Sequence, residues 1–273
     1  MTIIEPRPAL GGADARHDAT IGFGNVIGSE WTKVRSLRSS YVCAGLVALA
    51  MLGLAIALCA RWAHQQGPVP DWFDAVNTSL SGTYLAQVVV GTFGVMTISS
   101  EHTTGMIRAT FAAVPQRRAV FAAKVLMVGV PTLLLGELLG FSSFTVGQAL
   151  LAHKDIGVSL ADPGALRSAF GPGLYLGLAA LLGLGIGAIV RHTAGAISLY
   201  FAVMFALDPV VDLLPTSWRN DLINYLPVNA GTQIFTTVNV KGALAPWNGL
   251  VVSALYAVAA LLAGFLLIDI RDA

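Results

Sequence analysis

The chain has 273 residues, of which 55% are hydrophobic and 11% are charged, and its mean hydropathy is +0.72. A soluble domain carries about 25% charged residues, so this composition excludes an ordinary soluble protein. The formal net charge of +1 decides little, because in a membrane protein the placement of the charges sets the topology. We expect an all-α, polytopic membrane protein with no nucleic-acid partner.

The first forty residues show no apolar core of the length expected of a cleavable signal peptide. They hold Pro6, Pro8, Gly11 and Gly12 together with charges of both signs. We expect residues 1–20 to form a disordered cytoplasmic tail.

Residues 21–40 show the pattern of an amphipathic helix. Ile27, Trp31 and Val34 recur at positions i, i+4 and i+7. The charged residues at the other positions are Glu30, Lys33, Arg35 and Arg38. We expect an interfacial helix in the headgroup layer, with its tryptophan at the interface and its cations near lipid phosphates. The alternative is a cytosolic extension of the first span.

Six apolar segments are long enough to cross a bilayer, which takes about 20 residues. They lie at about 41–60, 80–98, 121–151, 173–190, 193–214 and 249–268. Pro131 interrupts the third, whose start near Lys124 is uncertain. Cys43 and Cys59 lie in the first, about 24 Å apart along a helix, so we expect free apolar thiols.

Six spans place both termini on one side of the membrane. That side holds 11 of the 16 Lys and Arg residues, and the other side holds the remaining five. The five are Arg61, Lys154, Arg167, Arg219 and Lys241. Because the side richer in Lys and Arg is normally cytoplasmic, both termini are expected in the cytoplasm. Residues 215–248 are too apolar for a solvated loop, and we expect short helices at the outer surface there.

The polar stretch 101–118, EHTTGMIRATFAAVPQRR, separates the second and third spans. Glu101 suits a helix N-terminus through the helix dipole. Ile107, Phe111 and Val114 recur at helical spacing, and Pro115 ends the pattern before Arg117 and Arg118. We expect a short amphipathic helix on the cytoplasmic side. It acts either as a topology anchor of positive charge or as a rigid contact for a soluble partner.

Three stretches resemble ABC-2 transporter permeases of the actinobacterial type. They are EWTKVRSLRSSY at 30–41, EHTTGMIRATFAAVPQRRAVFAAK at 101–124 and LINYLPVNAGTQIF at 222–235. The resemblance implies the membrane half of an ATP-driven exporter in a bacterial plasma membrane, with two permease copies and two ATPase subunits that hold the ATP. It also implies a coupling helix seated on the ATPase. Its residues are Glu101, Gly105, Met106, Ile107, Arg108, Phe111, Pro115, Arg117 and Arg118. His102 and Thr103 depart from the aromatic-then-basic pair expected after the Glu.

The sequence holds no GxxxxGK[ST] loop, so ATP hydrolysis by that route belongs to a separate chain. We expect no catalytic, metal or cofactor site on this chain. An intramembrane hydrolase is a weak rival, since SLSG at 79–82 has no histidine placed deep beside it and HExxH is absent. A membrane component that does not transport, such as an immunity or sensory subunit partnered with an ATPase, remains open.

Acidic and amide side chains inside spans mark candidate translocation residues. Glu137 lies mid-span in the third segment, Asp208 lies late in the fifth, and Gln87 lies in the second with the weaker candidate Thr92. Each has a structural alternative as a hydrogen-bonded packing residue. GxxxG pairs at 136 and 140, at 173 and 177, and at 183 and 187 predict close helix packing.

Overall fold

A computed structural model describes residues 22–70, 72–106, 116–238 and 242–271, and in these ranges the fold is all helical. Within these described ranges, six helical segments are long and apolar enough to cross a membrane. They are α2 (Arg38–His64), α3 with α4 (Ala75–Leu80 and Thr83–Thr103), α6 (Arg117–Leu151), α7 (Ala165–Val190), α8 to α9 (Thr193–Asp212) and α12 (Pro246–Arg271). The expected number of spans is confirmed. Several spans are longer than expected, notably the third, which begins at Arg117, and the fourth, which begins at Ala165.

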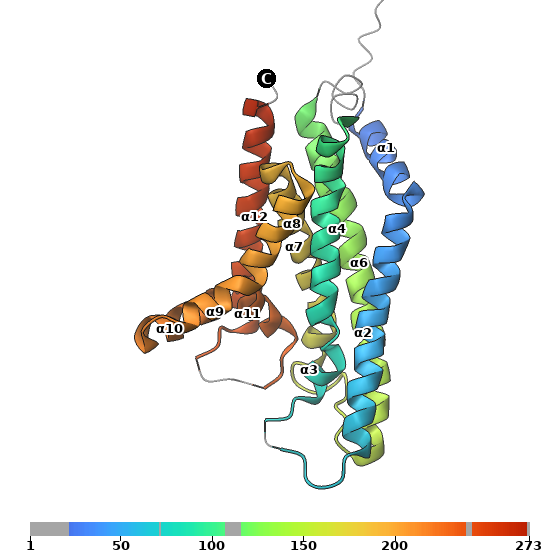
Figure 1. Cartoon of the computed structure of the whole chain (residues 1–273). Helices are drawn as coiled ribbons and strands as arrows, with labels where there is room; N and C mark the ends of the chain where they lie inside the picture. The colour runs from blue at the N-terminus through green and yellow to red at the C-terminus, as the bar shows by residue number, and fades with distance from the viewer. Residues whose placement is uncertain (1–21, 71, 107–115, 239–241, 272–273) are drawn as a thin grey trace, which may run out of the picture.

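The spans form an upright bundle with α7 at its centre. Figure 1 shows α4, α6 and α12 around α7, with α2 on the far side of α4 and α6. Helix α7 is central because its glycines let neighbouring backbones come close. A Cβ on Gly183 would collide with the backbone of Gly91 on α4, and one on Gly185 would lie 2.6 Å from the backbone of Ala260 on α12. A Cβ on Gly136 of α6 would likewise lie 2.7 Å from the Cα of Gly173. The close packing predicted from the glycine pairs is confirmed at these crossings.

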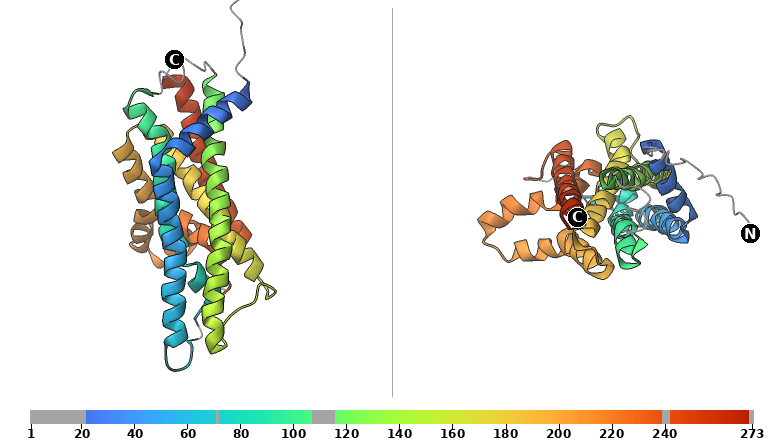
Figure 2. Two further views of the ribbon diagram at one scale, coloured as in Figure 1. Left: turned by 90° about the vertical axis from the view of Figure 1, so that its right-hand side faces the viewer. Right: turned by 90° about the horizontal axis from the view of Figure 1, so that it is seen from above.

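The described ends of the chain lie at the same end of the bundle, which we call the α1 end (Figure 1). Helix α1 (Phe23–Ser36) crosses this end over α6 and meets the start of α2, as the side view in Figure 2 shows. The chain leaves helical geometry at Leu37, whose ψ of 123° is extended, and α2 begins at Arg38. The expected helix over 21–40 is therefore shorter, and Arg38 belongs to the first spanning helix. Serines on both sides of Leu37 are weak helix formers, which favours the break there.

The short helices expected before the last span lie on the side of the bundle, toward its opposite end, which we call the α3 end (Figure 1). They are α10 (Thr216–Leu222), η3 (Ile223–Tyr225), α11 (Pro227–Thr232) and η4 (Gln233–Phe235). The fifth span reaches them through a π-helical turn at Ala202–Ala206, after which α9 and α10 project sideways from the bundle (Figure 1). Arg167 on α7 holds η4 in place by donating to the carbonyls of Gln233, Ile234 and Thr236 at 3.1, 2.7 and 2.8 Å.

Candidate functional site: a buried charge cluster at the α1 end

Four charged side chains meet where α1, α4 and α6 come together. Lys124 Nζ lies 2.8 Å from Glu30 Oε2 and 2.7 Å from Glu101 Oε1. Lys33 Nζ lies 2.6 Å from Glu30 Oε1 and 3.1 Å from Glu101 Oε1. We call these four residues the charge cluster. Each lysine bridges both carboxylates, so the cluster ties three helices that are up to 94 residues apart in sequence.

Each helix brings its charge to this point for a local reason. Val26 and Glu30, one turn apart on α1, are the buried residues of that helix. Val26 packs against Val120 and Ala123 of α6, which lays α1 across α6 and points Glu30 at Lys124. Lys33 follows Glu30 by three residues and therefore lies on the same face.

The cluster is electrically balanced and largely removed from solvent. Lys124, Glu30 and Glu101 are 1%, 3% and 7% exposed, whereas Lys33 lies at the rim. Burial alone lowers the pKa of Lys33, but its hydrogen bond to Glu30 and the charge of Glu101 outweigh this effect and raise it. Lys33 is therefore a cation at neutral pH. Removing one partner from such a buried set leaves an uncompensated charge, which costs about 3–5 kcal/mol.

Gln87 lies inside the bundle at the junction of α4, α7 and α8. It is 1% exposed, and its side-chain carbonyl accepts from the Tyr175 hydroxyl. Its side-chain NH₂ donates to the Tyr84 carbonyl at 3.0 Å, and its backbone carbonyl accepts from Tyr200 Oη at 2.9 Å. Thr92 donates to the Val88 carbonyl of its own helix at 2.8 Å. The structure thus gives both residues hydrogen-bonded packing positions within one subunit.

The two intramembrane acids have different surroundings. Asp208 at the start of α9 accepts from the Asn229 side chain at 2.9 Å, and Asn229 also donates to the Ile223 carbonyl, so this acid joins the fifth span to α11 and η3. Glu137 lies against Gly173 of α7, where a Cβ would meet its Oε1 at 2.6 Å. Its buried Oε2 has no hydrogen-bond donor among the described residues.

A comparison with known protein families identifies the family of this chain. The model of a family described as ABC-2 family transporter protein matches residues 26–207, which is two thirds of the chain and includes the whole charge cluster. The chain belongs to the ABC-2 transporter family. It is a permease component, and its family and six apolar helices make it a multi-pass membrane protein. No curated protein matches it. The third resembling stretch, 222–235, lies outside the matched residues.

The structure corrects the position of Glu101 in this permease. The residue was expected to open a helix, but it lies in the last turn of α4. A carboxylate at a helix C-terminus is disfavoured by the dipole by about 0.3–1 kcal/mol. Its buried ion pairs with Lys124 and Lys33 are the larger effect, because breaking such pairs costs several kcal/mol.

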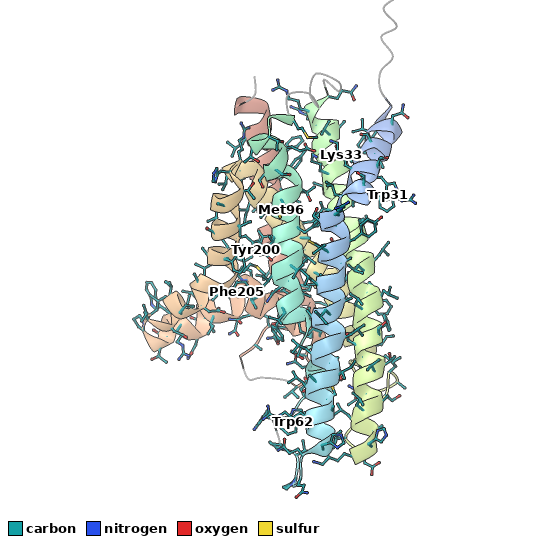
Figure 3. All side chains as sticks on the ribbon, turned by 45° about the vertical axis from the view of Figure 1, so that its right-hand side comes forward. Trp31, Lys33, Trp62, Met96, Tyr200 and Phe205 are labelled. Atoms are coloured by element: carbon teal, nitrogen blue, oxygen red, sulfur yellow. The ribbon has the colours of Figure 1, made fainter. Side chains whose placement is uncertain are left out.

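Two further expectations differ in detail. Arg117 and Arg118 were expected to follow a helix, but they open α6, where Arg118 stacks 5.6 Å from the ring centroid of Phe265 on α12. Lys33 was expected near lipid phosphates, but its ammonium contacts Glu30 and Glu101. Trp31 and Arg35 are exposed on α1, as an interfacial helix requires, and Figure 3 marks Trp31 and Lys33 on it.

Part of the expected coupling segment is described. Gly105 adopts a left-handed conformation with a φ of 73° just after α4, and the Met106 side chain is exposed. Ile107, Arg108, Phe111 and Pro115 lie outside the described residues. The segment 101–118 thus begins at Glu101 in the last turn of α4 and ends at Arg118 in the first turn of α6. Two members of the charge cluster, Glu101 and Lys124, lie on these two helices.

Lys124 is the member that sequence reasoning missed, having counted it only as a positive charge beside the third span. The sequence does hold one indication of its role. Lys124 lies two turns into an apolar helix, and an ionisable residue in that position needs a partner of opposite charge. Its partners are Glu30 in the middle of α1 and Glu101 in the last turn of α4. In the part of the chain that is described, no group of three or more His, Cys, Asp or Glu could hold a metal ion.

Proposed function

We propose that this permease forms the membrane pathway of an exporter driven by a separate ATPase, whose contact is the segment 101–118. The charge cluster carries the proposal. It joins α1, α4 and α6 at the point where this segment leaves and re-enters the bundle. A displacement of the segment is therefore passed to three helices at once, since packed elements move as rigid units between discrete states.

Charge distribution supports a cytoplasmic α1 end. Lys33, Arg35, Arg38, Arg117 and Arg118 all belong to this end, and so do the described parts of the segment, residues 101–106 and 116–118. The positive-inside rule then puts both termini in the cytoplasm of a bacterial cell, where ATP is available to the ATPase partner. A second copy of the permease completes the pathway, and drug-like, peptide and lipid cargoes are all compatible with this arrangement.

The test compares two charge-reversal pairs with the same change in net charge. Arg117→Glu with Arg118→Glu alters the C-terminal end of the segment, whereas Lys154→Glu with Arg219→Glu alters a half-buried and an exposed residue away from it. We expect the first pair to abolish co-purification with the ATPase and the second to leave it intact. Ile107→Pro should act like the first pair, and Ile107→Ala should be close to wild type.

Transport itself is measured in vesicles that contain the complex. ATP-dependent movement of cargo supports the export function, whereas ATP hydrolysis without movement supports a non-transporting immunity or sensory component. If Ile107→Pro retains both co-purification and export, the coupling role of 101–118 is wrong.

A further inference from the structure

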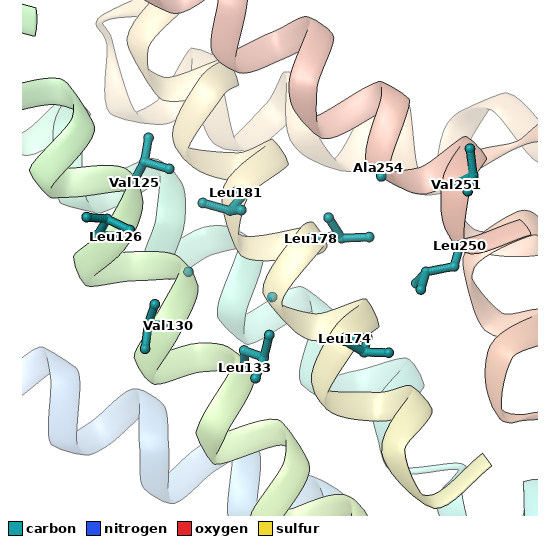
Figure 4. Close-up of a pocket in the computed structure, with 12 residues that line it drawn as sticks. Val125, Leu126, Val130, Leu133, Leu174, Leu178, Leu181, Leu250, Val251 and Ala254 are labelled. Atoms are coloured by element: carbon teal, nitrogen blue, oxygen red, sulfur yellow. The ribbon is translucent and has the colours of Figure 1, made fainter. Parts of the chain in front are cut away.

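A groove on the side of the bundle has no role in the coupling proposal. It lies between α6, α7 and α12 and has a volume of about 430 Å³, which is within the usual range of ligand pockets. Figure 4 shows its lining side chains, among them Val125, Leu133, Leu178 and Ala254, all aliphatic. Gly129 and Gly177 also line it, and they let α6 and α7 pack closely, since a Cβ on either would lie 3.3 Å from Leu181 or 3.4 Å from Leu133.

The groove opens toward the hydrocarbon of the membrane. Leu126, Val130 and Val251 on its rim are 40%, 48% and 58% exposed, and all three belong to spanning helices. A ligand could therefore enter laterally from the bilayer without crossing an aqueous opening.

Glu137 lies one helical turn beyond the end of this groove. It follows the lining residue Leu133 by four positions, and Gly173, against which its carboxyl lies, precedes the lining residue Leu174. Side chains on an α-helix lean toward its N-terminus, so Glu137 leans toward the turn of Leu133 and the groove. Its Oε2 is buried without a donor among the described residues. An ionised carboxylate in this position lacks the partner that such groups normally have in a membrane.

We propose that this groove binds a lipophilic cation, whose apolar body fills the aliphatic channel and whose charge is balanced by Glu137. A phospholipid chain would fill the groove but would leave the carboxylate without a partner. A second copy of the chain docked here by two-fold symmetry would bring two Glu137 carboxylates into one interface, where like charges repel. A cation with delocalised charge satisfies both the apolar walls and the acid at once.

Lipophilic cations would then be one class of cargo or ligand for this permease. As a cargo class the idea rests on the proposed export function, but binding at the groove requires neither ATP nor an ATPase. Binding and export can therefore be tested separately.

The probe is radiolabelled tetraphenylphosphonium, added to the purified permease in nanodiscs. Tetraphenylborate has the same shape and the opposite charge, so it serves as the matched competitor. We expect saturable binding of the phosphonium that the borate does not displace. Glu137→Gln removes the charge at nearly constant shape and should raise the apparent Kd at least about tenfold, which corresponds to a loss of about 1.4 kcal/mol or more.

The second part of the test blocks the groove with a bulky side chain. Ala254→Phe places a ring in the groove and should also raise the Kd at least about tenfold. Ala57→Phe makes the same change on the exposed face of α2 and should leave the Kd unchanged. Absence of saturable binding, equal displacement by the borate, or a normal Kd in either Glu137→Gln or Ala254→Phe would overturn the proposal. Binding that passes these tests while ATPase co-purification fails would refute the export function alone.

Discussion

Replacement of Lys124 by methionine tests the structural role of the charge cluster. The substitution keeps a long apolar stem but removes the ammonium that lies 2.8 Å from Glu30 and 2.7 Å from Glu101. Both carboxylates are almost fully buried, so water cannot take its place. The variant therefore leaves an uncompensated negative charge in the buried cluster, and the loss of unfolding free energy measures what that charge costs.

The magnitude follows from the contacts that remain. Loss of one partner of a buried ion pair costs about 3–5 kcal/mol. Lys33 still bridges the two carboxylates at 2.6 and 3.1 Å, which places the expected loss at the lower end, about 3 kcal/mol. For a chain of this size about 1 kcal/mol corresponds to about 2–4 °C, so the unfolding midpoint should fall by about 6–12 °C.

The assay is thermal unfolding of the purified permease in detergent, followed by the loss of the monodisperse chromatographic peak. Lys154→Met is the matched control, because Lys154 is a half-buried lysine whose contacts, to the carbonyls of Gln65 and Gly67 at the α3 end, are exposed. We expect the control to shift the midpoint by less than about 2 °C, as is usual for exposed contacts.

A double variant separates charge balance from packing. Glu30→Gln combined with Lys124→Met removes one charge of each sign and leaves Lys33 paired with Glu101. It should be more stable than the sum of the single losses predicts, by about 0.5–3 kcal/mol. A fall of less than about 2 °C for Lys124→Met, or strict additivity in the double variant, would contradict our account of the cluster.

Three other predictions concern alkaline pH, helix packing and the α3 end. Because folding raises the pKa of Lys33, its stabilising contribution is complete below its ordinary pKa of 10.5 and is lost as pH rises through the raised value. The difference in unfolding midpoint between wild type and Lys33→Met should therefore stay constant from about pH 7 to about 10 and disappear above that range. Gly183→Ala should destabilise the bundle by about 1–3 kcal/mol in the same thermal assay, because its Cβ would collide with the backbone of Gly91. Gly53→Ala should be neutral, because its Cβ would make an ordinary contact with Leu49 at 3.8 Å; equal midpoints for the two variants would disprove this reading of the α4–α7 crossing. Arg167→Lys removes the planar guanidinium that donates to the carbonyls of Gln233, Ile234 and Thr236. Limited proteolysis should therefore cut residues 233–238 faster than in wild type. Unchanged cleavage would mean that other contacts hold this segment.

The site residues show where sequence reasoning reached its limit. Trp31 and Arg35 could be placed on an amphipathic helix, because helical periodicity within one segment assigns residues to faces. Glu30 and Glu101 could not be paired with Lys124, because no local pattern relates residues on three separate helices. For the same reason, Glu137 and Gln87 looked alike as polar residues inside spans. The structure then gave Gln87 partners on α4, α7 and α8 and left Glu137 Oε2 without a donor among the described residues.

Hydrophobicity, chain length and glycine spacing along this sequence were enough to determine an all-helical membrane protein with six spans, because a bilayer of fixed thickness requires long apolar helices. Tertiary structure alone decided that α7 is the central helix, that α1 turns at Leu37 to lie over α6, and that two lysines and two glutamates form one buried cluster. The physical reason is that each spanning helix is favoured by its own apolar residues, so it can be recognised one segment at a time. The partners of a buried charge depend instead on how separate helices cross, and packing between residues far apart in the chain sets those crossings.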